Sequence, residues 1–531
     1  MKSLKRFLVI LFFLVGAFSF TPPGQTILAS GSDLYLKLRV FNDMIKIINE
    51  NYVETVDWSK TMEGAQSGLM EALDPHSVFI GSERLEQINE NFRGNFEGIG
   101  IEFDIIDDYI TVITPIVGSP SEDLLEPGDK IVSIDGESAY RIDREGVFER
   151  LRGPKGTRVE LEVNRAGYDE LIPVTIIRDK IPIYSVLAKF VMSDGTGYIL
   201  LNRFSATTSD EFLSALDELQ SQGMQRLIID LRHNSGGYMD EVLKIVDAFL
   251  PAGEMMLSTK GRLKNANEEF ISSNKGDYYR LPVIVMINRG SASASEILSG
   301  AIQDLDRGLV VGETSFGKGL VQRQYPLRDG SALRVTVARY YTPSGRLIQR
   351  PYTNGDTDEY YEELYDEHYG EMDSTSLKER PRFKTKTGRT VYGGGGIKPD
   401  YNLVQPGTIT RDLARIRRSD ARYFFKMAGE YAEEHPQLGD DWQTFLNDFR
   451  LDDGFMDRIY GDMLNMDETV SEDSLRQDDE VIRVYIKSEL AGKFWGKNQE
   501  YQIRTAIDNQ VQDARRYFDE ATEIARNAGY F

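Results

Sequence analysis

The sequence predicts a multidomain protein with α/β and α+β parts: an α/β core, a β module inserted before it, and helical regions at both ends. Three observations carry this prediction. The chain has 531 residues, more than a single hydrophobic core usually organises. Strand-like and helix-like segments alternate from Tyr198 onward, as in α/β folds. Short β-type runs separated by turn residues fill the region between Asn95 and Lys180.

The first thirty residues have the layout of a signal peptide. Basic residues precede an apolar run from Phe7 to Phe20, and a small-residue stretch ends at Ser30. This run is short for a bilayer span, so we expect a cleaved leader over residues 1–30, with a retained anchor as the alternative. The protein is then exported, to the periplasm or another extracytoplasmic place. The chain contains no cysteine, which excludes disulfides, thiol nucleophiles and thiolate metal sites.

Helical patterns dominate both ends of the remaining chain. Over residues 31–92, apolar residues such as Leu36, Val40 and Met44 recur at helical spacing, which predicts an N-terminal helical domain. Residues 408–531 are also helical in character, with many acidic residues and little β signal. Before them, the acidic and tyrosine-rich stretch from Asp356 to Lys386 has no clean period and is expected to be a loop excursion.

Between these ends we expect a β module over residues 93–180 and an α/β core over residues 181–407. The predicted core strands are Tyr198–Leu201, Leu227–Asp230, Val283–Ile287 and Leu309–Gly312. The predicted core helices are Ser209–Gln222, Met239–Leu250 and Ser295–Leu305. The net charge of −23 repels phosphate backbones and anionic lipid, so we expect no nucleic acid partner and membrane contact only through a retained leader.

Ser293 stands in a turn of small residues between a buried strand and an amphipathic helix. The segment reads Val283-Ile-Val-Met-Ile-Asn-Arg-Gly-Ser-Ala-Ser-Ala-Ser-Glu296. Such a turn presents a hydroxyl at a helix N-terminus, where unpaired backbone N–H groups favour developing negative charge. Ser293 is therefore a candidate nucleophile. The alternative is that Ser293 and Glu296 form a capping box, which needs no catalysis.

A serine nucleophile needs a base, and the four histidines are poor candidates for that role. We expect His76 in a helical segment beside Pro75. His368 and His435 lie in acidic stretches, and only His233 is close to a predicted core strand. Each of them is expected to be structural or solvated.

Lysine can replace histidine where burial lowers its pKa enough to leave the amine neutral. Lys318 is the candidate, because it follows the predicted strand Leu309–Gly312 within one βαβ step of Ser293. Flanking glycines indicate a constrained backbone, and Phe316 offers apolar cover. The alternative for any lysine is an ordinary solvated position.

The segment from Gly312 to Lys318 also fits the first seven positions of a phosphate-binding P-loop. The match fails at Gly319, where the pattern requires a metal-binding Ser or Thr. It fails again at Leu320–Tyr325, which has the pattern of a strand where a P-loop needs a helix. A nucleotide-binding function is therefore not expected.

These residues together resemble the C-terminal processing, or tail-specific, peptidases, a family of Ser-Lys serine peptidases with an inserted PDZ domain. The family's Ser-Ala-Ser-Ala-Ser-Glu turn, its Gly-Glu-x-x-Phe-Gly-Lys-Gly segment and a glutamine four residues further on are met by Ser293, Lys318 and Gln322. The resemblance implies that Ser293 attacks the peptide carbonyl, that Lys318 is the general base and that Gln322 orients the lysine. It covers roughly residues 33–405, from a Leu-Asp-Pro-His-Ser segment at 73–77 to a Gly-Gly-Gly-Ile-Lys-Pro-Asp segment at 394–400.

The resemblance also implies where an oxyanion would be bound. One donor is the backbone N–H of Ala294. The other belongs to a glycine of the turn Leu231-Arg-His-Asn-Ser-Gly-Gly237, where Gly236 is favoured and Gly237 stays open.

Within the PDZ-like module, Gly98, Ile99, Gly100 and Ile101 match the carboxylate-binding loop of PDZ domains. Backbone N–H groups at a turn that glycine permits can hold a terminal carboxylate, while the next strand edge pairs with the peptide. The alternative is an ordinary strand that contains two glycines.

The sequence therefore predicts an exported serine endopeptidase that grips exposed apolar C-terminal tails and cleaves nearby through an acyl-enzyme. Its expected parts are a signal peptide (1–30), a helical domain (31–92), a PDZ-like domain (93–180), a Ser-Lys peptidase core (181–407) and a helical extension (408–531). No metal or organic cofactor is implied. The expected partners are proteins or peptides with exposed C-termini, and further an adaptor or a second copy.

The alternative function is a catalytically silent PDZ-type peptide-binding scaffold. A Ser-His-Asp hydrolase is disfavoured, because a G-x-S-x-G elbow is missing.

Overall fold

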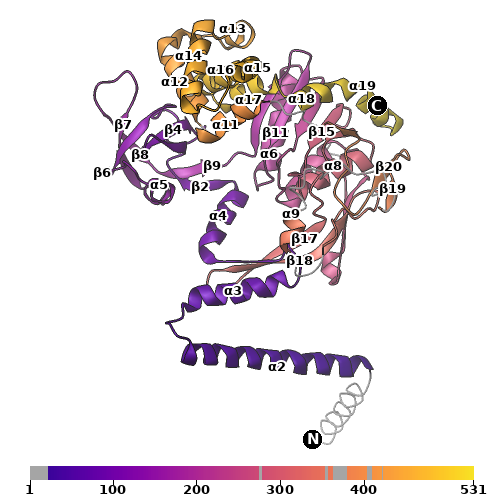
Figure 1. Ribbon diagram of the computed structural model, residues 1–531. Helices are drawn as coiled ribbons and strands as arrows, with labels where there is room; N and C mark the ends of the chain where they lie inside the picture. The colour runs from indigo at the N-terminus through magenta and orange to yellow at the C-terminus, as the bar shows by residue number, and fades with distance from the viewer. Residues whose placement is uncertain (1–21, 274–277, 353–356, 363–379, 404–408, 421) are drawn as a thin grey trace, which may run out of the picture. The chain divides into compact units, whose positions relative to one another are not determined.

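The computed structural model describes residues 22–273, 278–352, 357–362, 380–403, 409–420 and 422–531. It divides into two compact units, residues 1–70 and 71–531 (Figure 1). The first unit holds helix α2 (Pro22–Asn51) and nearly all of α3 (Trp58–Glu71). Most of the predicted leader lies outside the described residues, and α2 runs without a break through residue 30. Among the described residues, no helix combines the length and the apolarity that a membrane span requires.

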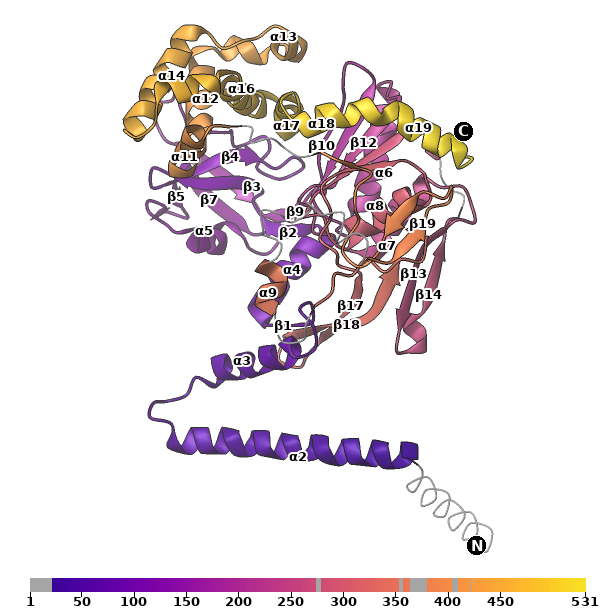
Figure 2. The same cartoon turned by 45° about the vertical axis from the view of Figure 1, so that its right-hand side comes forward.

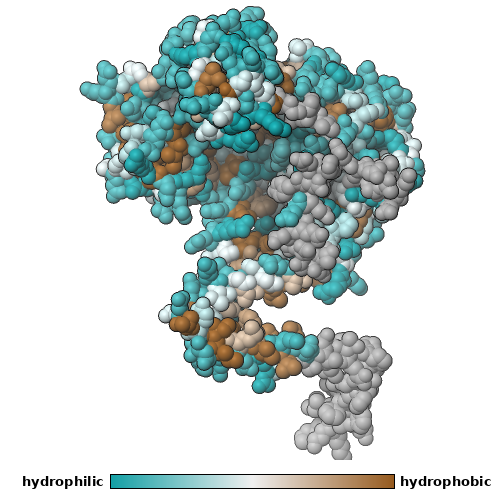
Figure 3. Space-filling model, in the orientation of Figure 1, coloured by the Kyte–Doolittle hydropathy of each residue, from teal (hydrophilic) through white to brown (hydrophobic). Residues whose placement is uncertain are grey.

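Helix α2 exposes apolar side chains from Leu34 onward. Leu36, Val40 and Met44, which the sequence pattern places on a helix, are 58%, 49% and 52% exposed. The lower part of Figure 3, where Figure 1 places α2, shows brown, apolar surface. Exposed apolar area of this kind marks contact surfaces more often than ordinary protein surface.

The region between α3 and the PDZ-like module is not purely helical, which corrects the prediction for residues 31–92. Helix α4 (Ser82–Arg93) fits it, but β1 (Val78–Ile80) is a strand that pairs antiparallel with β18 (Ala332–Tyr341). Three residues are too few to show a period in the sequence, and β1 exists because β18 offers it an edge.

The PDZ-like module is an antiparallel sheet with a short helix, α5 (Arg144–Leu151), as its sequence texture predicts. Its strands are β3 (Ile101–Ile106), β4 (Tyr109–Pro115), β5 (Lys130–Ile134), β6 (Glu137–Ser138), β7 (Arg158–Asn164) and β8 (Ile172–Ile177). β7 alternates exposed and buried residues, as a strand with one solvated face should. β2 (Asn95–Gly98) and β9 (Asp179–Pro182) pair where the chain enters and leaves the module. In the described sheet β3 is the end strand and pairs with β4 alone.

The core is a six-stranded sheet in the order β10-β11-β12-β15-β16-β21. Its strands are β10 (Val186–Val191), β11 (Thr196–Leu201), β12 (Arg226–Asp230), β15 (Val283–Ile287), β16 (Leu309–Gly312) and β21 (Tyr401–Asn402). All neighbours from β11 to β21 are parallel, and β10 is antiparallel to β11. Four of these strands were predicted, and two of the four have the predicted bounds.

Alternate residues along the core strands face opposite sides of the sheet, and helices cover both sides. One face, with Ile229, Val285 and Val310, packs against three helices. They are α6 (Thr208–Ser221), α7 (Met239–Ala248) and α8 (Ala294–Asp304), within two residues of the predicted bounds. The fold class expected from the sequence is therefore confirmed: an α/β core, a β module and helical ends.

The opposite face of the core sheet is covered by the last helices of the chain, α18 (Asn509–Ala514) and α19 (Phe518–Asn527) (Figures 1 and 2). Ile228, Ile284 and Met286 of the sheet share a hydrophobic cluster with Val511 and Phe518. The sequence shows which side of these helices is apolar but not what that side packs against. We therefore propose that the core comprises residues 181–407 together with 508–531, and that the extension ends near residue 507.

A second sheet beside the core carries part of the site. Its order is β1-β18-β13-β14, and β17 also pairs with β18. Its further strands are β13 (Met255–Gly261), β14 (Glu268–Ile271) and β17 (Leu320–Pro326). β17 begins two residues after Lys318 and confirms the predicted strand there, so the helix that a P-loop needs is absent from this described segment.

The remaining helices form a bundle with its own apolar cluster. They are α11 (Arg411–Ser419), α12 (Tyr423–Glu434), α13 (Trp442–Asn447), α14 (Asp453–Met466), α15 (Glu472–Gln477), α16 (Asp479–Trp495) and α17 (Lys497–Thr505). Of the predicted loop excursion, the structure describes α9 (Thr357–Glu362) and β19 (Arg382–Lys384), which pairs with β20 (Thr390–Tyr392). Residues 363–379 lie outside the described residues, and His368 with them.

Candidate active site

Ser293 is the residue directly before helix α8, where the turn of small residues predicts it. Its φ of 55° lies in a region that residues other than glycine rarely adopt. Backbone strain of this kind gathers at functional sites. The backbone N–H of Ser293 donates to Glu296 Oε2 at 2.8 Å, so a capping contact exists beside any catalytic role.

The turn contains three serines, and their environments differ. Ser291 and Ser295 are fully buried, and their hydroxyls donate to the backbone oxygens of Leu231 and Asn234 at 2.8 Å each. Ser293 is the one of the three that lines the neighbouring pocket. Ser291 and Ser295 therefore hold the turn in place, whereas Ser293 faces the pocket.

That pocket has a volume of about 900 Å³. Ser293, Lys318, Gln322, Gly236 and Gly237 all line it, so the fold brings together most of the residues predicted from the sequence. Apolar side chains complete its wall: Ile88, Phe92, Ile297, Leu320, Val337 and Ala338. Among the described residues, no group of three or more His, Cys, Asp or Glu side chains is placed to hold a metal ion.

Lys318 enters the pocket from the loop between β16 and β17. Burial, with the nearby Arg334, lowers the pKa of its amine from 10.5 to about 8. Glu296 and Asp74 act in the opposite direction. The amine donates to Gln322 Oε1 at 2.8 Å. Ser293 and Lys318 line the same pocket. Among the described contacts, no hydrogen bond joins their side chains.

Gln322 is held by a turn near the start of the second unit. Its side-chain amide donates to the backbone oxygen of His76, which directs the other end of the amide to Lys318. Asp74 shapes this turn, because its carboxylate accepts the backbone N–H groups of His76 at 2.9 Å and Ser77 at 2.8 Å. The sequence did not reveal the role of the His76 carbonyl, since it depends on contact between distant segments.

His76 itself corrects a prediction, because it lies in this turn and not in a helix. Its ring is buried, and Nε2 lies 3.1 Å from the Tyr360 hydroxyl. Burial, with Lys318 nearby, lowers the pKa of His76 to about 3, so the ring is neutral at physiological pH. The ring is thus an uncharged group near Lys318.

The two glycines that were left open as oxyanion donors differ in this structure. The N–H of Gly236 donates to Asn234 Oδ1 at 2.9 Å. The N–H groups of Gly237 and Ala294 have no partner among the described hydrogen bonds. Gly236 nevertheless lies against the nucleophile, because a Cβ built on it would be 2.8 Å from Ser293 Cβ and 2.9 Å from Ala294 N.

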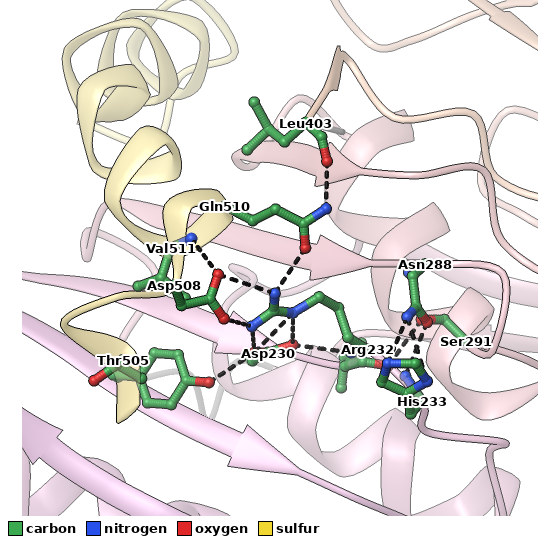
Figure 4. A network of polar contacts seen from close by, with 12 residues as sticks. Asp230, Arg232, His233, Asn288, Ser291, Leu403, Thr505, Asp508, Gln510 and Val511 are labelled. Atoms are coloured by element: carbon green, nitrogen blue, oxygen red, sulfur yellow. Dashed lines mark hydrogen bonds and ion pairs between the residues drawn. The ribbon is translucent and has the colours of Figure 1, made fainter. Parts of the chain in front are cut away.

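The turn that carries these glycines is anchored to the last helices through Arg232, as Figure 4 shows. The Arg232 guanidinium contacts Asp230 at 2.6 Å and Asp508 at 2.7 Å, and donates to Gln510 at 2.7 Å. The negative charges of Asp230 and Asp508 thus balance the positive charge of the nearly buried Arg232 guanidinium. In the same turn the backbone N–H of His233 donates to Asn288 Oδ1 at 2.9 Å, and His233 does not line the pocket.

The predicted carboxylate-binding residues lie in the PDZ-like module, where Gly98 ends β2, Ile99 and Gly100 connect the strands and Ile101 begins β3. They do not line the Ser293 pocket. Gly100 has a φ of 88°, and a Cβ built there would be 2.2 Å from Ser119 Cβ. The hydroxyls of Ser119 and Ser121 donate to the backbone oxygens of Gly100 and Ile99 at 2.9 Å and 2.7 Å. The loop is therefore fixed beside the open edge of β3.

Comparison with known proteins assigns the two main parts. The model of peptidase family S41 matches residues 195–358, and a PDZ domain model matches residues 111–165. The carboxy-terminal-processing protease of Bartonella bacilliformis is 36% identical over 350 residues, which cover 64% of this chain and 80% of that protein. Carboxy-terminal processing protease CtpB of Bacillus subtilis is 37% identical over 309 residues, 57% of this chain and 64% of that one.

Among solved structures, the photosystem II D1 C-terminal processing protease is 26% identical. The match covers 70% of this chain and 89% of that one, with a TM-score of 0.34. The family expected from the motifs is confirmed by the curated relatives. The chain belongs to peptidase family S41, as a serine peptidase of the carboxy-terminal processing type that carries a PDZ domain.

Proposed function

We propose that this peptidase cleaves peptide bonds with Ser293 as nucleophile and Lys318 as general base. One observation carries the proposal: both residues line one pocket, where Gln322 holds a lysine whose pKa is lowered by burial. A neutral amine can accept the hydroxyl proton, and a charged one cannot. Catalytic hydrogen bonds often tighten only when substrate is bound, so their absence in the free protein is compatible with this role.

In the proposed reaction, Lys318 removes the Ser293 hydroxyl proton while the oxygen attacks the substrate carbonyl. The oxyanion is stabilised by the N–H of Ala294 and that of Gly237 or Gly236. The tetrahedral intermediate expels the amine of the leaving fragment, which takes the proton from Lys318. Water then attacks the Ser293 ester with Lys318 as base, releasing a carboxylic acid and restoring the hydroxyl.

Activity should rise with pH through an acid limb near the Lys318 pKa of about 8. Below that pH the amine is protonated and cannot act as a base, and above it the neutral form dominates. The test is kcat/KM for an unfolded protein substrate between pH 5 and pH 10. A rate that is flat across this range, or that falls as pH rises from 6 to 9, would remove the lysine from the base role.

We propose further that the PDZ-like module holds the substrate's terminal carboxylate at Gly98–Ile101. The support is a loop fixed by Ser119 and Ser121 beside β3, whose outer edge pairs with no other described strand and can therefore accept an extended peptide. Hydrogen bonds to a charged group contribute about 1.5–3 kcal/mol, so amidating the substrate's C-terminus should raise KM roughly tenfold or more. Equal KM values for the free and amidated tails would refute this recognition mode.

The curated relatives are proteases by name, which favours a peptidase over the silent PDZ scaffold. Export stays a prediction of the sequence, because most of the leader lies outside the described residues. An adaptor or a second copy also stays a prediction. The apolar side chains that α2 exposes are the surface where we expect such a contact.

A further inference from the structure

Glu296 is a fully buried carboxylate surrounded by donors from both halves of the site. Oε2 accepts the backbone N–H groups of Ser293 and Lys318 at 2.8 Å each. Oε1 accepts the backbone N–H of Gly317 at 2.7 Å and the hydroxyl of Ser315 at 2.6 Å. Two carboxylate oxygens provide about four acceptor positions, so this side chain is saturated.

The same two segments are joined a second time, through their carbonyl groups. The buried Tyr340 hydroxyl lies 2.8 Å from the backbone oxygen of Lys318 and 3.1 Å from that of Ser293. Tyr340 comes from β18, a strand of the other sheet. Neither the Tyr340 contacts nor the bonds that join Glu296 to the Lys318 segment are required by the helix or strands themselves. Capping α8 needs only the bond from Ser293 to Glu296.

We propose that Glu296 and Tyr340 are positioning residues that clamp the backbone of the nucleophile to the backbone of the base. Glu296 joins their N–H groups and Tyr340 joins their carbonyls, so the segments carrying Ser293 and Lys318 cannot separate without breaking buried hydrogen bonds. This inference rests on the proposed Ser293–Lys318 chemistry. Productive geometry in such a pair depends on fractions of an ångström, which is what a double clamp controls.

The charge of Glu296 matters as well as its shape. All four of its partners are donors, so only the ionised carboxylate can accept every bond. Its negative charge acts on Lys318 against the effect of burial and raises the pKa of that amine. Among the described residues, Glu296 makes no hydrogen bond or ion pair with the Lys318 amine, which donates to Gln322. The clamp therefore holds the lysine's backbone while its amine stays available.

The decisive variant is Glu296→Gln, which keeps the shape but turns a donor NH₂ toward at least one backbone N–H group, whichever way the amide is oriented. We expect kcat to fall roughly 100-fold with KM little changed, because the Ser293 hydroxyl and the Lys318 amine lose the relative position that proton transfer requires. We also expect the acid limb of kcat/KM to move to lower pH, because the charge that raises the Lys318 pKa is gone. A role in stability alone would lower the unfolding temperature and leave kcat, assayed well below that temperature, close to that of wild type.

Two further variants keep the test decisive if Glu296→Gln folds poorly. Tyr340→Phe removes the second bridge without changing charge, so kcat should fall while the limb stays. Ser299→Ala removes a buried hydroxyl, bonded to Ser295 O at 2.8 Å on the same helix, and should lower stability alone.

The clamp is overturned if folded Glu296→Gln or Tyr340→Phe keeps kcat within threefold of wild type. Failure of the proposed chemistry looks different: Lys318→Met would then stay active, whatever the clamp variants do.

Discussion

Replacing Ser293 with alanine is expected to lower kcat/KM for an unfolded substrate with an apolar tail by at least about 10³-fold. The reason is that the acyl-enzyme route needs this hydroxyl, and no other serine of the turn can replace it. Ser291 and Ser295 are buried and bonded to backbone oxygens. The measurement is steady-state cleavage with purified protein, with circular dichroism to verify the fold.

The matched control is Ser295→Ala, two residues away, which removes a structural hydroxyl from the same turn. It should lower the unfolding temperature and, assayed well below that temperature, leave hydrolysis within a few-fold of wild type. Residues that act as one unit are strongly non-additive. The double variant Ser293→Ala/Lys318→Met should therefore lose little beyond either single variant. Equal activity of Ser293→Ala and wild type would refute the nucleophile.

The second large effect is expected at Gly236, where alanine should lower kcat roughly 10²–10³-fold. The new methyl group would lie 2.7 Å from the Ala292 oxygen, 2.8 Å from Ser293 Cβ and 2.9 Å from the Ala294 nitrogen. It would crowd the nucleophile and the neighbouring N–H group whether the second donor is Gly236 or Gly237. Single-turnover kinetics separates this loss in the chemical step from weaker substrate binding.

Gly236 also has a φ of 96°, so any side chain there adds backbone strain. Gly223→Ala is the control, because Gly223 has a φ of 89° and nothing within 4 Å of a built Cβ. It should cost similar strain, about 1 kcal/mol, and leave kcat unchanged. If Gly236→Ala behaves like Gly223→Ala, the turn has no part in stabilising the oxyanion.

Much of the core could be predicted because its signals are local. Val283–Ile287 and Leu309–Gly312 are continuous apolar runs, as strands buried on both faces must be. Ser293 was visible as a serine between such a strand and a helix, and Lys318 as a lysine after the next strand. The role of Gln322 came from the family resemblance, because nothing in its own strand marks it.

The remainder depends on contacts between distant segments. His76 was expected in a helix, but the Asp74 carboxylate closes a turn there and leaves the His76 carbonyl to Gln322. The helices after residue 508 show an apolar side without revealing that it covers the core sheet. Glu296 looked like half of a capping box, and its bonds to Gly317 and Lys318 appear only once the two loops meet.

The account depends on an amine whose pKa lies far enough below the ordinary lysine value to leave part of it uncharged near neutral pH, and a direct titration of Lys318 tests that claim. The measurement is NMR of lysine labelled with ¹³C at Cε in the inactive Ser293→Ala protein, with Lys318→Met to assign the signal. The predicted midpoint is close to pH 8. A midpoint at or above the ordinary value of about 10.4, both free and with a tail peptide bound, would contradict the proposed mechanism.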